Sequence, residues 1–177
     1  KTTALYDRFV NQGAVMGDSF GLENVLWFAN NKEDAHEEPT IKRSRSHNYV
    51  SKEVINVREN VGVIEVANFS KHEFKGPDAR KFLDHIMAGK LPKPGRISLT
   101  PMLTYRGKLY GDLTVACIDE NEFMVFGSGA AQEMHRRWFE SHLEKFNLQY
   151  NNRSDEFHGL GIAGPKSREL LQKIVRE

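Results

Sequence analysis

GPDARKFLDHI (residues 76–86) is the stretch that predicts how this chain folds, because a second version, GPKSRELLQKI (residues 164–174), lies near the other end. The two versions share the glycine, the proline, the arginine, one leucine and the final isoleucine, and each follows a short strand pattern. A proline in the first turn of a helix removes no hydrogen bond, so we expect Pro77 at the first helical position. The repeat predicts two strand, Gly-Pro and helix units, in which the Gly-Pro pairs set helix starts and are not catalytic.

Three strands and a long helix are expected between the two copies. The strands are predicted at residues 97–106, 108–118 and 122–127, where apolar stretches are separated by turn residues. The helix is predicted over residues 130–146, with Met134 and Trp138 on one face. Together these patterns predict an α+β fold, in which a ferredoxin-like, pseudo-duplicated antiparallel sheet carries flanking helices.

The N-terminal part is less regular. A helix is predicted over residues 3–12, followed by a structured loop over 17–30 and a solvated, charged loop over 31–49. Ser51 is expected to cap a short helix that follows it. We therefore divide the chain into residues 1–50, an N-terminal helix and structured loop, and residues 51–177, the α+β region. The chain begins with Lys and stops inside a helical pattern, so we expect a fragment of a longer protein.

The composition excludes several classes of protein. Hydrophobic residues make up 39% and charged residues 28% of the 177 residues, which predicts a soluble protein with a buried core. A net charge of +1 gives no basis for a dedicated nucleic-acid or membrane partner. The single cysteine, Cys117, excludes a disulfide framework and is read as a small apolar strand residue. We expect a cytoplasmic location, or the mitochondrial matrix if the source is eukaryotic.

Two further motifs are weak evidence for a ligand, one for a dinucleotide and one for a metal ion. FGSGAAQEM (residues 126–134) contains Gly-x-Gly between a strand and a helix, but Gln132 stands where a dinucleotide fingerprint needs Gly or Ala. His135 and His142 share one helix face without Cys or paired carboxylates at ligand spacing. We interpret that face as solvated and expect no metal.

Asp112, in YRGKLYGDLTV (residues 105–115), begins an apolar strand, where a rigid scaffold can present a side chain to a cleft. Two readings are open from the local pattern. In the first, Asp112 is a turn carboxylate that caps the hairpin. In the second, it is a functional carboxylate that binds a cation or protonated amine, or orients a nucleophilic nitrogen.

Four blocks in order resemble the aminomethyltransferase family, which includes the T-protein of the glycine cleavage system and the folate-binding C-terminal region of dimethylglycine and sarcosine dehydrogenases. The blocks are ALYDRFVNQGAVMGDSFGLENVLWFA (4–29), VRENVGVIEVANFSKHEFKGPDARKFLDHI (57–86), ISLTPMLTYRGKLYGDLTV (97–115) and GIAGPKSRELLQKI (161–174). The resemblance implies a T-protein-like fold whose C-terminal β-domain is missing here. It also implies tetrahydrofolate as cofactor and one-carbon transfer from an amine as activity.

The resemblance also implies site residues. Asp112 matches the family's catalytic aspartate near the folate nitrogens and the substrate amine. Phe69 stands where the T-protein has a methionine against the pterin, Leu99 where it often has a tyrosine, and Ala130 where it often has a folate-contacting asparagine. These departures, with the Thr-Pro-Met-Leu run and the Gly-Ser-Gly before the long helix, favour the dimethylglycine/sarcosine dehydrogenase branch.

The function expected from this resemblance is transfer of a methylene or aminomethyl unit from dimethylglycine, sarcosine or glycine to tetrahydrofolate. FAD is expected only if an upstream oxidoreductase domain belongs to the parent chain, because no phosphate-binding fingerprint for FAD is visible here. The alternatives are a folate-dependent demethylase of a sulfonium compound, a folate-binding module without catalysis, and a structural domain that shields an intermediate.

Overall fold

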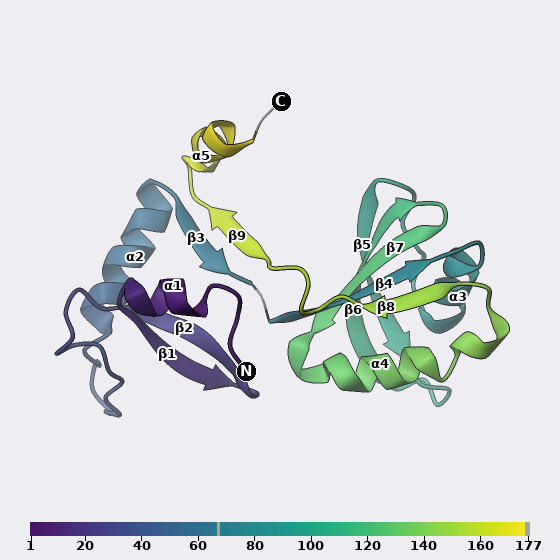
Figure 1. Ribbon diagram of the computed structural model, residues 1–177, viewed down its shortest axis with the longest axis horizontal. Helices are drawn as coiled ribbons and strands as arrows, with labels where there is room; N and C mark the ends of the chain where they lie inside the picture. Colours follow the sequence, from purple (N-terminus) through teal and green to yellow (C-terminus); the bar gives the residue numbers. More distant parts are fainter. Residues whose placement is uncertain (67, 176–177) are drawn as a thin grey trace. The chain divides into compact units, whose positions relative to one another are not determined.

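The computed structural model describes residues 1–66 and 68–175 and divides the chain into two compact units (Figure 1). Unit 1 holds the described residues of Lys1–Ala67 and His158–Glu177, and unit 2 is Asn68–Phe157. This division differs from the segments 1–50 and 51–177 expected from the sequence, because residues 62–65 pair with residues 160–163 within unit 1. Within the described ranges, no helix combines the length and apolar character that crossing a membrane requires.

Unit 2 is one antiparallel sheet with helices on one of its faces. Its elements are β4 (Phe69–Lys75), α3 (Ala79–Ile86), β5 (Arg96–Leu103), β6 (Leu109–Asp119), β7 (Glu122–Ser128), α4 (Gln132–Glu140) and β8 (Gln149–Asn152), with short 3-10 turns at Gly129–Ala131 and Leu143–Lys145. The strand order is β5-β6-β7-β4-β8, and every neighbouring pair is antiparallel. The antiparallel sheet with flanking helices that the sequence predicts is therefore confirmed, and β8 is an additional strand that the sequence pattern missed.

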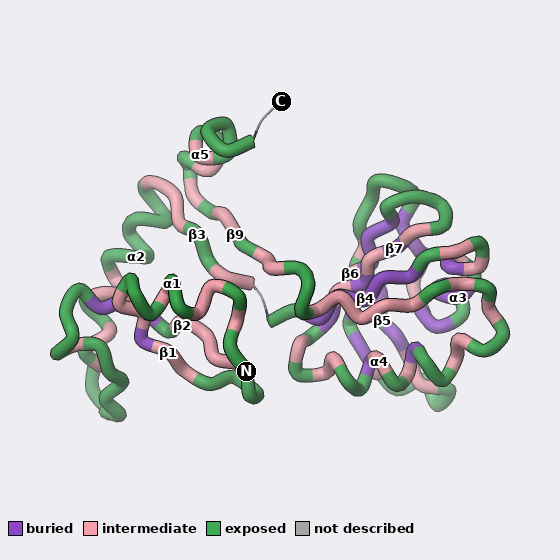
Figure 2. Tube along the Cα trace, viewed as in Figure 1, coloured by how far each residue is buried: buried purple, intermediate pink, exposed green. Residues whose placement is uncertain are grey.

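The core of unit 2 lies between the sheet and its two helices. Alternate residues of each strand point inward, so that Leu113, Val115 and Cys117 of β6 are buried while their neighbours face outward. Phe82 of α3 and Phe139 of α4 are fully buried against this inner face, and Figure 2 shows the buried residues concentrated in these strands and helices. The expected role of Cys117 as a small apolar strand residue is confirmed.

The two Gly-Pro copies form the same local structure in different units. Gly76 and Gly164 have φ of +142° and +127°, and each carbonyl accepts a hydrogen bond from the first helical amide, at 3.0 Å and 3.1 Å respectively. The helices that follow, α3 and α5 (Ser167–Ile174), are each eight residues long. Pro77 lies two residues before α3, outside the helix, which corrects its expected place at the first helical position. The copies set helix starts as predicted, but only the first contributes to the five-stranded sheet.

Unit 1 contains α1 (Tyr6–Asn11), the hairpin of β1 (Ala14–Ser19) and β2 (Leu22–Phe28), α2 (His47–Glu59), the pair β3 (Gly62–Glu65) and β9 (Leu160–Ala163), and α5. The β1–β2 hairpin overturns the prediction of a structured loop over residues 17–30. Its two-residue turn, Phe20 and Gly21, has φ of 53° and 81°, the left-handed pattern that matches strand twist. Phenylalanine rarely adopts this conformation, so Phe20-Gly21 was not recognised as a hairpin turn, although glycine is favoured at its second position.

The charged segment between β2 and α2 is stabilised by an ion pair and a hydrogen bond to one carboxylate, that of Asp34. Arg45 binds Asp34 at 2.9 Å, and the Tyr49 hydroxyl donates to the same carboxylate at 2.6 Å. These hydrogen bonds, that of Tyr49 above all, lower the pKa of Asp34. Helix α2 begins at His47, one turn before the predicted start. Ser51 is therefore inside the helix, donating to the His47 carbonyl, and is not a cap.

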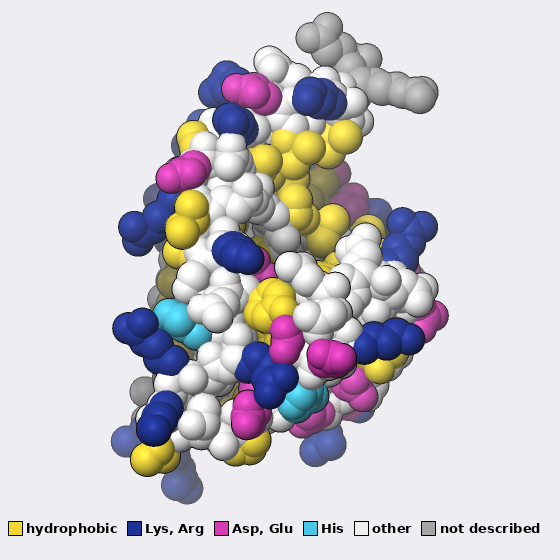
Figure 3. Space-filling view, turned by 90° about the vertical axis from the view of Figure 1, so that its left-hand side faces the viewer, with side chains coloured by type: hydrophobic (Ala, Val, Ile, Leu, Met, Phe, Trp, Pro, Cys, Tyr) yellow, Lys and Arg dark blue, Asp and Glu magenta, His cyan; other side chains and the backbone are white. Residues whose placement is uncertain are grey.

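Helix α2 and helix α5 of unit 1 have no buried residue among those described. Exposed apolar side chains lie on both helices and on β3, and Figure 3 shows hydrophobic side chains gathered near the C-terminal helix. The apolar side chains more than a third exposed on these elements are Val50, Val54, Ile55, Val57, Val63, Ile64, Leu171 and Ile174. The buried core of unit 1 is correspondingly small and consists of Val15, Trp27 and Ala29.

Candidate functional site

The outer face of the five-stranded sheet, opposite α3 and α4, is the face on which three of the predicted site residues lie, namely Asp112, Phe69 and Leu99. One row of paired residues crosses four strands of this sheet. Leu99 of β5 is opposite Thr114 of β6, Thr114 is opposite Phe126 of β7, and Phe126 is opposite Lys71 of β4. Residues opposite each other on adjacent strands point to the same face. Asp112 is two residues from Thr114 and therefore lies on this face as well.

Asp112 is exposed near the start of β6, opposite Pro101 of β5. Its carboxylate makes no hydrogen bond or ion pair with any residue in the ranges 1–66 and 68–175. The β5–β6 turn is closed instead by Thr104, whose carbonyl accepts from the Gly107 amide at 2.9 Å and whose hydroxyl accepts from the Lys108 amide at 3.2 Å. Asp112 is therefore not the turn cap, and its carboxylate is available to a ligand.

Phe69 and Leu99 lie on the same outer face as Asp112, and both are substantially exposed, at 49% and 67%. Phe69 is the first residue of β4 and pairs with Ser128, the last residue of β7. Ala130 lies in the short 3-10 turn just beyond Ser128. In this turn, the Gly129 amide donates a hydrogen bond to the Asn68 carbonyl at 2.8 Å. The structure thus places Asp112, Phe69 and Ala130 at one end of the sheet, where β4 and β6 begin and β7 ends.

A β-bulge immediately precedes Asp112. Met102 pairs with Gly111 and Leu103 pairs with Leu109, so Tyr110 is an extra residue in β6. Bulges bend a strand and re-aim the side chains beside it. The Tyr110 ring packs inward on Trp138 of α4 with ring centroids 4.5 Å apart, while Asp112 points to the opposite face.

His135 holds this bulge from the other side of the sheet. Its Nε2 lies 3.3 Å from the Tyr110 carbonyl oxygen, and since a carbonyl only accepts, Nε2 carries the proton. The side chain is 2% exposed, which corrects the expectation that the His135 face of the helix is solvated. The helix buries His135 and Phe139 and leaves Met134 41% exposed. Met134 is therefore not part of the buried face.

His135 belongs to a buried polar cluster that we define as Ser70, His72 and His135. Ser70 Oγ, His72 Nε2 and His135 Nδ1 are all buried without a partner among the described protein atoms, although His72 Nδ1 lies 2.9 Å from the Tyr150 hydroxyl. Burial, with a smaller contribution from the neighbouring His135, lowers the pKa of His72 to about 4. Burial also lowers the pKa of His135, so both imidazoles are neutral at pH 7. The sequence analysis singled out His135 alone from this cluster, although Gly111 and Gly127 in strand interiors are a signal of close approach.

The outer face also carries a satisfied ionic group beside the site. Glu73 of β4 is 8% exposed and binds Arg153 at 2.8 Å and the Asn151 amide at 3.0 Å. Arg153 binds Glu156 at 2.6 Å and lies over the Phe157 ring. These partners tie β4 to β8 and the segment after it, so we assign the group a structural role. No group of three or more metal-ligating side chains occurs in the part of the chain that the structure describes.

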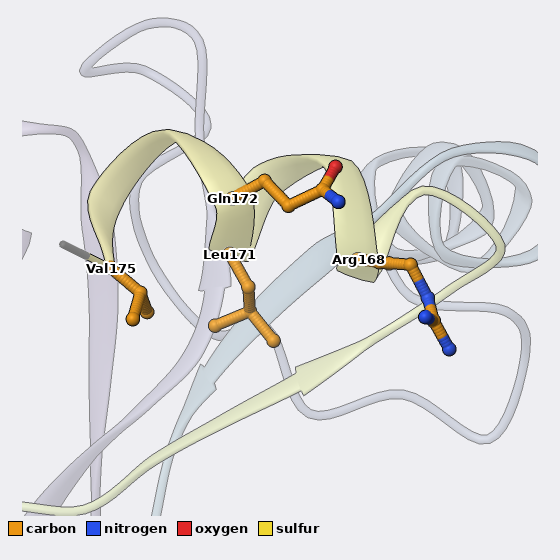
Figure 4. A pocket seen from close by; sticks show the side chains of 4 residues that line it. All are labelled: Arg168, Leu171, Gln172 and Val175. Atoms are coloured by element: carbon orange, nitrogen blue, oxygen red, sulfur yellow. The ribbon is translucent and has the colours of Figure 1, made fainter. Parts of the chain in front are cut away.

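A shallow pocket lies elsewhere, on α5, lined by Arg168, Leu171, Gln172 and Val175. Figure 4 shows Leu171 and Val175 pointing to one side of the helix. Among the described residues, the lining of this pocket contains no acid, nucleophile or aromatic residue, and we assign it no chemistry.

A model of the GCVT N-terminal domain matches residues 5–177, which is nearly the whole chain. This chain belongs to the GCVT N-terminal domain family. The mitochondrial dimethylglycine dehydrogenase of Mus musculus is 36% identical to this GCVT N-terminal domain over 165 residues, covering 92% of this chain and 19% of that protein. An aminomethyltransferase of Thermotoga sp. (strain RQ2) is 26% identical over 179 residues, covering 100% of this chain and 44% of that protein.

A solved structure agrees with the sequence relatives. The glycine cleavage system aminomethyltransferase T from Bartonella henselae matches this GCVT N-terminal domain with a TM-score of 0.76 at 20% identity, covering 98% of this chain and 43% of that one. The expected T-protein-like fold and the resemblance to the aminomethyltransferase family are therefore confirmed. The chain spans less than half the length of the aminomethyltransferases and about a fifth of the dehydrogenase that it matches.

Proposed function

We propose that this domain takes part in the tetrahydrofolate-dependent transfer of a one-carbon unit from an amine such as dimethylglycine, sarcosine or glycine. The observation that carries the proposal is the exposed, unpaired carboxylate of Asp112 on the same sheet face as Phe69 and Leu99. Membership of the GCVT N-terminal domain family and the likeness to dimethylglycine dehydrogenase support the reaction class and the choice of amine.

The residues of the outer face fit a folate. Phe69 offers a half-exposed aromatic ring for a flat heterocycle, and Leu99 adds exposed apolar surface on the same face. Phe69, Leu99 and Ala130 would hold the folate, and Asp112 would face its reacting edge. Tetrahydrofolate, when bound, supplies the nitrogen that accepts the one-carbon unit.

Asp112 acts by charge and orientation. An amine that carries the one-carbon unit is positively charged or becomes so as the unit leaves, and a fixed carboxylate stabilises that charge. The same carboxylate orients the amine by accepting a hydrogen bond from it. Because Asp112 has no ion pair with any of the described residues, none of their interactions has to be broken when a cationic ligand arrives.

We place the oxidation of the amine outside this domain. The mouse relative is a dehydrogenase of which this chain covers only 19%, which supports an FAD oxidoreductase domain as a partner in the parent polypeptide. The same relative is mitochondrial by name, which supports a mitochondrial location if the source is eukaryotic.

The test is Asp112→Asn in the full-length gene product, with Asp119→Asn on the same strand as the matched control. Asp112→Asn should lower methylenetetrahydrofolate formation from dimethylglycine about a hundredfold while leaving thermal unfolding unchanged, because the carboxylate has no internal partner. Asp119→Asn should leave product formation unchanged.

Three outcomes would contradict this proposal. Equal product yield with Asp112→Asn would remove the catalytic role. Preferred turnover of a methylated sulfonium would favour a demethylase. Tetrahydrofolate binding by the wild type without turnover of any methylated amine would favour a binding module.

A further inference from the structure

His135 occupies a recess made by two glycines in adjacent strands. A Cβ at Gly111 of β6 would lie 2.8 Å from His135 Nε2, and one at Gly127 of β7 would lie 3.1 Å from His135 Nδ1. Neither glycine has a positive φ, so their backbone conformation does not require glycine. The missing side chains instead make room for the imidazole, which can then reach the strand backbone.

Both ring nitrogens of His135 are directed at this sheet. Nε2–H donates to the Tyr110 carbonyl at the bulge. Nδ1 is left as an acceptor. A Cβ atom at Gly127 would lie 3.1 Å from His135 Nδ1 and also 3.1 Å from Ser70 Oγ of β4. Both atoms are buried and have no hydrogen-bond partner among the described residues, so the Tyr110 carbonyl is the partner through which His135 holds the strand.

We propose that His135 is a positioning residue: through Nε2–H it fixes the Tyr110 bulge and hence the direction of Asp112. The proposal rests on the function assigned to Asp112 for its effect on catalysis. The geometry at the bulge stands independently of that assignment.

The physical reason is that a bulge bends its strand and re-aims the side chains beside it. Asp112 is two residues from the extra residue, Tyr110, so the shape of the bulge affects the direction of the Asp112 side chain. A bulge leaves its extra residue out of the regular ladder, and here the Tyr110 carbonyl finds its partner in His135. Without that partner, the strand before Asp112 would be free to shift register or fray.

The experiment compares His135→Leu with His135→Gln in the full-length gene product. Leucine fills the recess without a donor, whereas the glutamine Nε2 can occupy the position of the imidazole Nε2 and donate to Tyr110. We expect His135→Leu to lower kcat for the one-carbon transfer at least ~10-fold with KM changed less than ~2-fold, because the acid is misdirected. His135→Gln should restore kcat to within ~3-fold of the wild type.

A double-mutant cycle separates positioning from general destabilisation. If His135 acts through Asp112, adding His135→Leu to Asp112→Asn causes no further loss of kcat. Phe139→Leu, a buried substitution one turn further along α4, serves as the control, since it should reduce stability without a selective loss of kcat.

Amide hydrogen exchange tests the bulge without reference to catalysis. His135→Leu should accelerate exchange at Gly111 and Asp112, and His135→Gln should not. Additive kcat losses in the cycle, or unchanged exchange in His135→Leu, would overturn the positioning role. Full activity in Asp112→Asn would overturn the proposed function instead and would leave the exchange result to decide on His135.

Discussion

His135 and Gly111 are in direct contact across the inner face of the sheet, so closely that a methyl group on Gly111 would lie 2.8 Å from Nε2 of the imidazole. We therefore predict that Gly111→Ala lowers the free energy of unfolding by roughly 1–3 kcal/mol through overpacking. Urea unfolding measures this loss. In a His135→Ala background the same substitution should cost much less, and an equal loss in both backgrounds would exclude the His135 contact as the cause.

We predict that the free energy of unfolding depends on pH through the protonation of the buried His72. In the folded state its pKa is lowered to about 4 from 6.5, so the unfolded chain takes up a proton first as the pH falls. The stabilising contribution of neutral His72 is therefore complete above pH 6.5 and is lost between pH 6.5 and pH 4. At pH 5 the free energy of unfolding should be about 2 kcal/mol lower than at pH 7.5 on this account.

Denaturant unfolding across this pH range checks the His72 prediction. The groups that face His72 are the Tyr150 hydroxyl, the Phe139 ring and His135, with Glu133 acting at longer range. His135, whose pKa is also lowered, contributes in the same direction. His72→Gln should thus flatten the pH dependence without abolishing it, and an unchanged slope would show that His72 is not the titrating group.

The helix start at Gly76 can be tested against the proline beside it. Gly76 has a φ of +142°, and a Cβ there would lie 2.8 Å from the Leu148 Cα and 2.9 Å from the Asn147 carbonyl oxygen. We predict that Gly76→Ala lowers the free energy of unfolding by at least ~2 kcal/mol, because both strain and backbone contact oppose it. Pro77→Ala, at an exposed position outside the helix, should change stability by less than ~1 kcal/mol. Similar losses for the two variants would contradict this role of Gly76.

Phe69 and Phe74 are on the same strand and on opposite faces of it, so their substitutions should separate binding from stability. Phe74 is fully buried, and Phe74→Ala should lower the free energy of unfolding by roughly 3–5 kcal/mol. Phe69 is 49% exposed, and Phe69→Ala should lower it by less than ~1 kcal/mol. In the full-length protein, Phe69→Ala should instead raise the Kd for tetrahydrofolate roughly tenfold through lost ring contact. An unchanged Kd would remove Phe69 from the folate site.

Local patterns were sufficient for most elements of unit 2. The apolar stretches at β5, β6 and β7 and the Gly-Pro pair before α3 carry their structure in nearby residues, because alternation and helix starts are short-range properties. The β1–β2 hairpin was missed since Phe20 is an unusual residue for a left-handed turn. The pairing of β3 with β9 joins segments nearly a hundred residues apart, and no local pattern encodes it.

The amino-acid sequence by itself determined the α+β character, the Gly-Pro helix starts, the family and the choice of Asp112 as the residue of interest. Only the tertiary structure decided that Asp112 is not the turn cap, that Phe69 and Leu99 share its face, and that His135 is buried beneath the bulge. The physical reason is that a strand's period of two fixes which side chains are neighbours only once register and bulges are known. A single extra residue, Tyr110, interrupts the β5–β6 register beside Asp112, and the partner of its carbonyl lies on a helix 25 residues further along the chain.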